Sequence, residues 1–228
     1  MNTLSKSFIA VFIIVLCSAC LNDEPLFDGQ SCISDCIVFT GKVTDPNNDI
    51  PISTKLKITF TNGGLVFRRT ENIGVTSSNE LGEYSFSFPG ENYKVDNGYF
   101  IIKAEKAGYL VTEYDGRAVI YSVDSTNFDL PFVNDILLRP AAELQVSLKI
   151  DNVDLITDFV YSINYGGPKY GYRIPDEFLV QDTFYLYDVG GDQKTEVVYS
   201  YKKENQEIKV VDSIFINAGE KGIYEIDI

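Results

Sequence analysis

The 228-residue sequence contains no histidine and no tryptophan, and Met1 is its only methionine. Without histidine the chain cannot form a Ser-His-Asp triad, a Cys-His nucleophile pair or a zinc site with imidazole ligands. Glycosidase chemistry remains open, because it needs only two suitably spaced Asp or Glu side chains. The order of the acidic residues does not single out such a pair, and we expect neither enzymatic activity nor a bound cofactor.

Positive charge is scarce as well. The chain has 19 Lys and Arg residues against 33 Asp and Glu residues, which gives a net charge of −14. Proteins that bind nucleic acids cluster Lys and Arg in order to neutralise phosphates, and the sequence gives no basic patch of this kind. We therefore exclude nucleic acid as a partner.

An apolar run, FIAVFIIVLC, occupies residues 8–17 and follows the single positive charge of Lys6. A helix needs roughly 20 apolar residues to cross the hydrocarbon core of a bilayer, so this run is too short to do so. A short basic start followed by a run of this length is typical of a secretory signal peptide. We predict that residues 1–19 are such a peptide.

Cysteine is rare, and two of the four cysteines lie at the end of the apolar run and just after it, in Cys17-Ser18-Ala19-Cys20. This stretch resembles a bacterial lipobox, in which small residues precede a cysteine whose sulfur is acylated. The resemblance implies that Cys20 carries lipid and that the membrane is the first partner of the protein. Ordinary cleavage after a small-x-small pattern is the alternative.

The other two cysteines are Cys32 and Cys36, in the stretch CISDC. Removal of residues 1–19 leaves an odd number of cysteines, and lipid on Cys20 would leave Cys32 and Cys36 free to pair with each other. Two free thiols are the alternative, whereas a metal site would need more ligands. We predict a disulfide that stiffens the join between the tether and the first strand.

Residues 20–36 form an expected tether, with acidic residues at Asp23, Glu24 and Asp28 and no basic residue between 21 and 31. The segment resembles the acidic tag of Bacteroidota-type surface lipoproteins, which implies an outer-membrane, lipid-anchored protein at the cell surface. A generic acidic tether is the alternative. In either case an anionic membrane surface repels the acid, so the tether should extend into solvent.

Period-two alternation dominates the rest of the chain. In GEYSFSF (82–88) Tyr84, Phe86 and Phe88 share one face, and ELQVSLKI (143–150) and IYEIDI (223–228) alternate in the same way. Clusters of Gly, Pro, Asn and Asp separate these runs, and helical periodicity is missing after residue 20. The pattern predicts an all-β protein.

A domain boundary is expected near Pro140, which cannot donate to a strand ladder. The stretch NDILLRP (134–140) ends there and AAELQV begins a new alternating run. We predict two tandem β-sandwiches, transthyretin-like or immunoglobulin-like, over residues 37–139 and 141–228. A single long sandwich is the alternative.

Four segments of the first predicted domain occur in a characteristic order: FTGKVTDPNNDIPIS, TSSNELGEYSFSF, YFIIKAEKAGY and VNDILLRP. Together they resemble the carboxypeptidase regulatory-like domain, a transthyretin-like sandwich of seven strands. The matching positions are Gly41, Val43, Asp45, Pro51, Ile52, Asn79, Gly82, Tyr84, Phe86, Gly108 and Tyr109. The resemblance implies a non-catalytic module of the kind attached to peptidases, outer-membrane receptors and surface lipoproteins.

The second predicted domain is rich in tyrosine, most densely in YSINYGGPKYGYRIPDEF (161–178). One hypothesis is a glycan-binding loop in which tyrosine rings stack on sugars, at Tyr165, Tyr170 and Tyr172. Its hydrogen-bonding partners would be Arg173, Asp176 and Glu177. The alternative is that these aromatic residues simply favour strands on either side of a Gly-Gly-Pro turn.

Two oxygen-rich clusters could in principle hold calcium: Asp45, Asn47, Asn48 and Asp49, and the pair Asp188 and Asp192. Asn and Asp also close turns through their own side chains, and the calcium-loop pattern with its final glutamate is absent. We predict turns at both places and no metal site.

Three functions follow. The favoured one is a non-catalytic, membrane-anchored surface lipoprotein, a binding or accessory module for glycan or nutrient uptake, whose partner is a glycan or an outer-membrane protein. The first alternative is a structural stalk or fimbria-like adhesion subunit, which an exposed strand edge would favour. The second is a carboxylate-only glycosidase, which would need a pocket with two acids about 5 to 9 Å apart.

Overall fold

The computed structural model describes residues 24–29, 32–62, 69–93, 98–112, 116–121, 128–165, 170–174, 179–180 and 182–228. Most of these residues lie in β-strands, and the helices among them are two 3-10 turns, Glu91–Tyr93 (η1) and Val153–Leu155 (η3). The all-β prediction is confirmed. Within these ranges no helix has the length and apolarity needed to span a bilayer. The predicted signal peptide and Cys20 lie outside the described residues.

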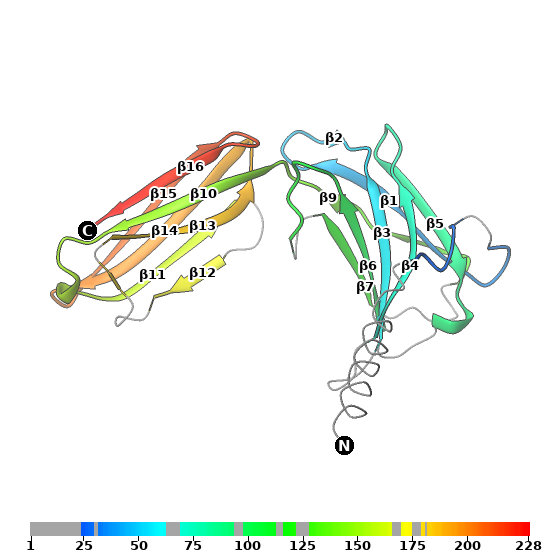
Figure 1. Cartoon of the computed structure of the whole chain (residues 1–228), viewed down its shortest axis with the longest axis horizontal. Helices are drawn as coiled ribbons and strands as arrows, with labels where there is room; N and C mark the ends of the chain where they lie inside the picture. The colour runs from blue at the N-terminus through cyan, green and yellow to red at the C-terminus, as the bar shows by residue number, and fades with distance from the viewer. Residues whose placement is uncertain are drawn as a thin grey trace, which may run out of the picture.

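Two β-sandwiches follow one another along the chain (Figure 1). In the first, one sheet has the order β2-β1-β5, with β8 and β9 parallel to β1, and the other has the order β4-β3-β6-β7. Its strands are β1 Cys36–Asp45, β2 Ile50–Pro51, β3 Lys55–Asn62, β4 Arg69–Ser77, β5 Glu83–Pro89, β6 Gly98–Glu105, β7 Arg117–Tyr121, β8 Pro131–Val133 and β9 Ile136–Leu137.

The second sandwich pairs a sheet of order β13-β10-β16 with a sheet of order β12-β11-β14-β15. Its strands are β10 Ala141–Lys149, β11 Ile156–Asn164, β12 Tyr170–Arg173, β13 Asp182–Gly190, β14 Gln193–Lys203, β15 Gln206–Ile216 and β16 Lys221–Asp227. Every ladder in this sandwich is antiparallel except the parallel pairing of β10 with β16.

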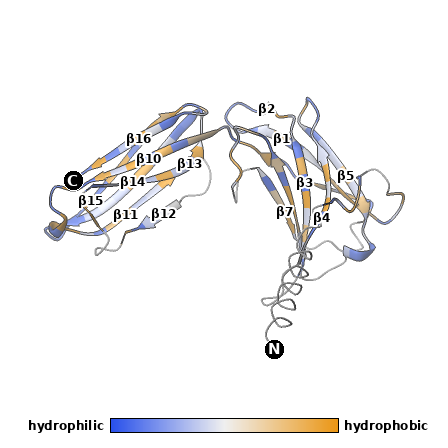
Figure 2. Cartoon of the chain, viewed as in Figure 1, coloured by the Kyte–Doolittle hydropathy of each residue, from blue (hydrophilic) through white to orange (hydrophobic). Residues whose placement is uncertain are grey.

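The alternation read from the sequence places the core between the sheets. On β5 the side chains of Tyr84, Phe86 and Phe88 are buried, and apolar and polar residues alternate along the strands of both sandwiches (Figure 2). The rings of Phe60 and Phe100 lie 4.7 Å apart in the first core. Full burial of a side chain of this size contributes roughly 1.5 to 3 kcal/mol, so aromatic packing is a main source of stability here.

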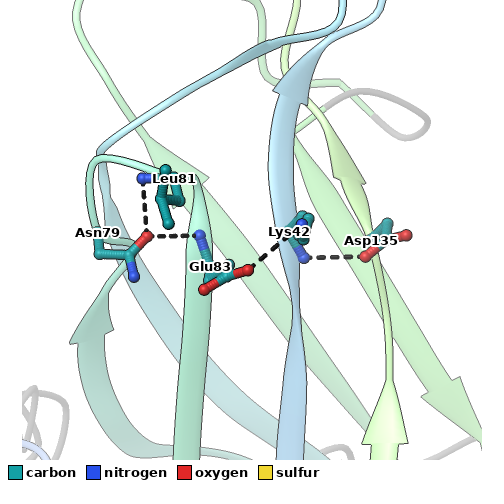
Figure 3. A network of polar contacts seen from close by, with 5 residues as sticks. All are labelled: Lys42, Asn79, Leu81, Glu83 and Asp135. Carbon is teal, nitrogen blue, oxygen red and sulfur yellow. Dashed lines mark hydrogen bonds and ion pairs between the residues drawn. The ribbon is translucent and has the colours of Figure 1, made fainter.

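The turn between β4 and β5, which connects the two sheets of the first sandwich, explains two of the positions that resemble the carboxypeptidase regulatory-like domain. The Oδ1 atom of Asn79 accepts hydrogen bonds from the backbone N–H groups of Leu81 and Glu83, both at 2.9 Å (Figure 3). Gly82 has φ +74°, and a Cβ atom there would lie 2.5 Å from the carbonyl oxygen of Val43. The turn therefore requires a side-chain acceptor at position 79 and a glycine at position 82.

The chain crosses between the sandwiches at Pro140, and the strand ladders of the described residues stay on one side of it or the other. The β6–β7 connection nevertheless reaches across. The N–H of Leu110 donates to the carbonyl of Arg139 at 2.8 Å, and the Leu110 side chain is buried in the core of the second sandwich. Asn47 also donates to the carbonyl of Gly191 at 3.1 Å. The strand ladders thus divide at Pro140, whereas the Leu110 side chain belongs to the second core.

Candidate functional site

A pocket of about 240 Å³ lies at one side of the second sandwich, where β13 faces β11 and β12. Both β12 and β13 are end strands of their sheets, so this is a side at which the two sheets are not joined by a strand ladder (Figure 1). The pocket is lined by Ile163, Tyr165, Tyr172, Leu186, Tyr187, Asp188 and Val189.

The alternation of side chains along β13 determines which of them face the inside of the sandwich beside the pocket. In TFYLYDVG (183–190) Tyr187 and Val189 lie opposite Leu144 and Ala142 of β10, whose side chains are buried. Tyr187 and Val189 therefore share the core-facing side of β13. Leu186 and Asp188 lie on the other face and are exposed, so the pocket includes residues from both sides of this edge strand.

Tyrosine rings pack against one another beside the pocket. The ring of Tyr172 lies 5.3 Å from that of Tyr161, in a stacked arrangement, and 5.0 Å from that of Tyr187. The hydroxyl groups of Tyr161 and Tyr187 share a hydrogen bond. Such ring pairs contribute about 0.5 to 1.5 kcal/mol each beyond the area they bury, so the pocket wall is held in place by its own neighbours.

The hydroxyl groups of this wall are neutral. Burial raises the pKa of Tyr161 well above the ordinary value, and its hydrogen bond with Tyr187 raises that pKa further. Burial also raises the pKa of Tyr187. Both phenols stay protonated at physiological pH, and each can donate and accept a hydrogen bond without acting as a base.

The residues around the pocket supply aromatic faces and aliphatic side chains, and Asp188, whose side chain lies on the outer face of β13, is at its rim. Among its described lining residues Asp188 is the single acid. A glycosidase would need two carboxyl groups about 5 to 9 Å apart. Pockets for drug-sized ligands occupy roughly 300 to 1,000 Å³, so a smaller one suits a compact group such as one sugar ring.

The structure brings together two of the four predicted ligand-binding residues, Tyr165 and Tyr172. Tyr172 on β12 is half-buried, and its ring lies against Tyr187. Tyr165 lines the same pocket but is 0% exposed and belongs to the second core. The prediction of Tyr165 as a solvent-facing stacking platform is wrong, because the β11 alternation that buries Tyr161 and Ile163 continues to Tyr165.

Arg173 does not line the pocket. It follows Tyr172 on the same strand and therefore points to the opposite face, where it forms a 3.0 Å ion pair with Asp158. The prediction that Arg173 supports a ligand at Tyr172 is wrong for this reason. The side chain of Tyr170 lies outside the described residues, as do Asp176 and Glu177.

Sequence reasoning missed Leu186, Tyr187 and Asp188 as site residues. The alternating stretch TFYLYDVG was visible as a tyrosine-rich strand. The order of residues does not show that β13 lies across from β12, which ends at Arg173, well before β13 begins at Asp182. The sequence does not show which strand lies beside β13 in the folded protein.

The structure places a disulfide between Cys32 and Cys36, with their Cα atoms 5.9 Å apart. Cys36 begins β1, and its N–H donates to Oδ1 of Asp129 at 3.0 Å. The bridge therefore joins the end of the acidic segment to a strand that is already held in the first sandwich. Cys20, the predicted site of lipid attachment, lies outside the described residues.

The first oxygen-rich cluster forms a turn, whereas Asp188 lies in β13 and Asp192 lies in the connection between β13 and β14. Oδ1 of Asp45 accepts from the N–H of Asn47 at 2.9 Å, and Oδ1 of Asn48 accepts from the N–H of Ile50 at 3.1 Å. Oδ1 of Asp192 accepts from the N–H of Ala218 at 2.8 Å. Among the residues that the structure describes, no three acidic or cysteine side chains come together as metal ligands.

Comparison with known proteins gives structural neighbours only. No protein-family profile matches the chain, and no characterised protein matches it in sequence. The TIE protein of Bacillus anthracis is 12% identical over 84% of this chain at a TM-score of 0.32, and the chain spans 34% of its length. The shaft pilin SpaA of Lactobacillus rhamnosus GG is 7% identical over 85% of this chain and 98% of its own, at a TM-score of 0.29. A streptococcal ancillary pilin is 10% identical over 85% of this chain and 62% of its own, at a TM-score of 0.31.

Proposed function

We propose that this protein is a non-catalytic, lipid-anchored surface module that binds carbohydrate in the pocket between β12 and β13. The observation that carries the proposal is the convergence of Tyr172 and Tyr187 on a pocket of about 240 Å³, with Asp188 exposed at its rim. It is a site of the size of one sugar ring, with aromatic faces and a charged acceptor.

The chemistry of the pocket fits a sugar better than an apolar ligand. A sugar ring has apolar C–H faces that pack on aromatic rings, and hydroxyl groups around its edge that need hydrogen-bond partners. Tyr187 offers a neutral phenol, and Asp188 offers a carboxylate, whose hydrogen bonds are among the stronger ones in proteins. A purely apolar ligand would use neither the phenol of Tyr187 nor the carboxylate of Asp188.

The anchoring part of the proposal rests on the sequence around Cys20. Two or three acyl chains on this residue would bind firmly, because each buried methylene contributes about 0.8 kcal/mol and one chain alone binds only marginally. An acidic tether would hold the two sandwiches away from an anionic membrane surface. A binding module in this position would serve as an accessory subunit in the uptake of glycans or other nutrients.

The experiment is a binding screen of the full chain, purified in detergent, against immobilised neutral oligosaccharides. We expect a retained sugar whose affinity falls at least about tenfold in Tyr172→Ala and in Asp188→Asn, since these changes remove a central aromatic contact and a charged acceptor. The matched control is Tyr201→Ala, because Tyr201 also stacks on a tyrosine, Tyr199, in the same sandwich but outside the pocket. Retention of no sugar, or equal affinity of Tyr172→Ala and the wild type, would contradict the proposal.

A structural or adhesive subunit is the second candidate, and one observation favours it. Strand β15 is 11 residues long and is an end strand that pairs with β14 on one side, with no ladder on its other side among the described residues. Val211 and Phe215 on this strand are 61% and 57% exposed. Such an edge can accept another strand. Ordered, concentration-dependent assembly in analytical ultracentrifugation that Val211→Lys abolishes would favour this function, and a monomer at all concentrations would argue against it.

A further inference from the structure

A second hollow, of about 500 Å³, lies on the first sandwich, on the face of the β4-β3-β6-β7 sheet that points away from the core. The core-facing residues of β3, Leu56 and Ile58, are 0% exposed, and Lys57 lies between them on the opposite face. The hollow is lined by Lys57, Thr59, Ile101, Lys103, Val111, Thr112 and Arg117.

Three of these lining residues form one basic row across three neighbouring strands. Lys57 on β3 lies directly opposite Lys103 on β6, and Lys103 lies directly opposite Arg117 on β7. Adjacent strands are about 4.8 Å apart, so the three positive charges start from Cα positions within roughly 10 Å of one another. Like charges placed directly opposite each other destabilise a sheet.

This row stands out in a chain whose net charge is −14. Lys103 lies 3.7 Å from Glu105, but both side chains are more than 40% exposed, and ion pairs of this kind contribute little. Lys57 and Arg117 also interact with other groups of the chain, and a ligand would compete with those contacts. A locally unfavourable arrangement that folding alone does not require is most common where a protein binds something.

Two tyrosines extend the same face. Tyr99 precedes Lys103 by four residues on β6, and Tyr121 follows Arg117 by four residues on β7, so all four side chains lie on one side of the sheet. The rings of Tyr99 and Tyr121 lie 5.7 Å apart, and Tyr121 is 70% exposed. The face therefore presents a row of cations and, further along the same strands, an accessible aromatic surface.

We propose that this face binds an oligosaccharide that carries a carboxylate or sulfate group. The anionic group would lie at Lys57, Lys103 and Arg117, and a neighbouring sugar ring would pack on Tyr121. Arg binds such planar or tetrahedral anions with paired hydrogen bonds, and Lys adds a point charge. Threonine hydroxyls at Thr59 and Thr112 supply further polar contacts.

The net negative charge of the whole chain favours some classes of anionic partner over others. A protein with a net charge of −14 repels densely charged polyanions and anionic bilayers at long range. A ligand with one or a few separated anionic groups gains the local attraction of the row without that repulsion. This favours an acidic oligosaccharide over nucleic acid or a lipid surface. The site is separate from the neutral-sugar pocket of the second sandwich and does not depend on it.

The test is calorimetric titration of the full chain, in detergent, with three probes: a galactan oligomer that carries one uronate group, the same oligomer with one sulfate group, and the neutral oligomer. We expect saturable binding of at least one acidic probe, at least about tenfold tighter than the neutral one and weaker at higher salt. The stronger of the two acidic probes identifies carboxylate or sulfate as the preferred group.

Variants locate the binding. Lys103→Gln and Lys57→Gln should each lower affinity for the acidic probe at least about tenfold, with a melting temperature equal to or above that of the wild type because a like-charge contact is removed. The matched control is Lys55→Gln, which removes the same charge from the same face of β3 but lies opposite Glu105 and outside the hollow; its affinity should stay within about twofold. Tyr172→Ala should bind the acidic probe like the wild type, so failure of this proposal is distinguishable from failure of the pocket in the second sandwich.

Several results would overturn the proposal. They are equal affinity for acidic and neutral probes, no binding of either acidic probe, and unchanged affinity in both Lys103→Gln and Lys57→Gln. Tighter binding of DNA or of vesicles containing anionic lipid than of any oligosaccharide would also overturn it. A lowered melting temperature in both lysine variants, together with no acidic binding by the wild type, would mean that the row stabilises the fold instead.

Discussion

The Tyr84 hydroxyl donates a 2.6 Å hydrogen bond to the main-chain carbonyl of Asn134, 50 residues later in the sequence. Burial raises the pKa of Tyr84 well above the ordinary value, so the hydroxyl keeps its proton and remains a donor. The carbonyl accepts this bond in the gap between β8 and β9, where Asp135 also accepts from the N–H of Lys42 at 2.9 Å. These contacts hold the interrupted closing strand of the first sandwich against β1.

Tyr84→Phe should lower the free energy of unfolding by about 1 to 2 kcal/mol. The ring still fills the core, but the carbonyl of Asn134 loses its donor in a partly buried place. Urea denaturation of the full chain measures the difference, with Tyr121→Phe as the control, because Tyr121 is 70% exposed. Equal stability of the wild type and Tyr84→Phe would show that the hydrogen bond contributes nothing.

Gly41→Ala should destabilise the first sandwich by about 2 kcal/mol or more. A Cβ atom at Gly41 would lie 2.0 Å from the carbonyl oxygen of Asn134, so β1 and the β8–β9 segment would have to separate. Gly171→Ala is the matched control, since a Cβ atom there meets nothing within 4 Å. The thermal midpoints of the two variants decide the matter, and a Gly41→Ala variant as stable as Gly171→Ala would contradict the packing described here.

Asp158 should titrate below the usual range of aspartate. A hydrogen bond from Lys202, together with the charge of Lys202 and then of Arg173, lowers the pKa of this carboxyl. Because the pKa in the folded state is below that in the unfolded state, the stabilisation is present above the ordinary aspartate pKa and is lost as pH falls through the lowered value. Carboxyl-carbon NMR titration measures the midpoint, which Lys202→Met should move upward. An identical midpoint in the two proteins would rule out this ion pair in solution.

Much of the fold is predictable from the sequence because strand alternation is a local property. The faces of 82–88 and 143–150 and the turn residues Asn79 and Gly82 depend on residues close together in the chain. The structure agrees with these predictions for physical reasons that the sequence already contains, such as the positive φ of Gly82.

What the sequence does not contain is which strands become neighbours. Tyr165 looked available because it precedes a Gly-Gly-Pro turn, but its strand continues into the core and buries it. Tyr187 meets Tyr172 only because the end strands of two different sheets lie across from each other. The same holds for the basic row, whose members are separated by 46 and 14 positions and meet through strand pairing.

In detergent phase separation, Cys20→Ala should move the protein from the detergent phase to the aqueous phase. The wild type should partition with detergent, because acyl chains on Cys20 supply the affinity for a micelle or bilayer. A Cys32→Ser, Cys36→Ser double variant is the control, since these two residues pair with each other and should not affect partitioning. Equal partitioning of the wild type and Cys20→Ala would exclude lipidation at this position.

Methyl NMR tests carbohydrate binding in the pocket of the second sandwich most directly. The full chain is titrated with the neutral sugar that it retains, and the recovered sugar is then analysed. We predict chemical-shift changes at Ile163, Leu186 and Val189, which line the pocket, no change at Leu56 and Ile58 in the core of the first sandwich, and a sugar recovered intact. Changes confined to other methyl groups would contradict the pocket as the binding site, and a shortened sugar would contradict binding without catalysis.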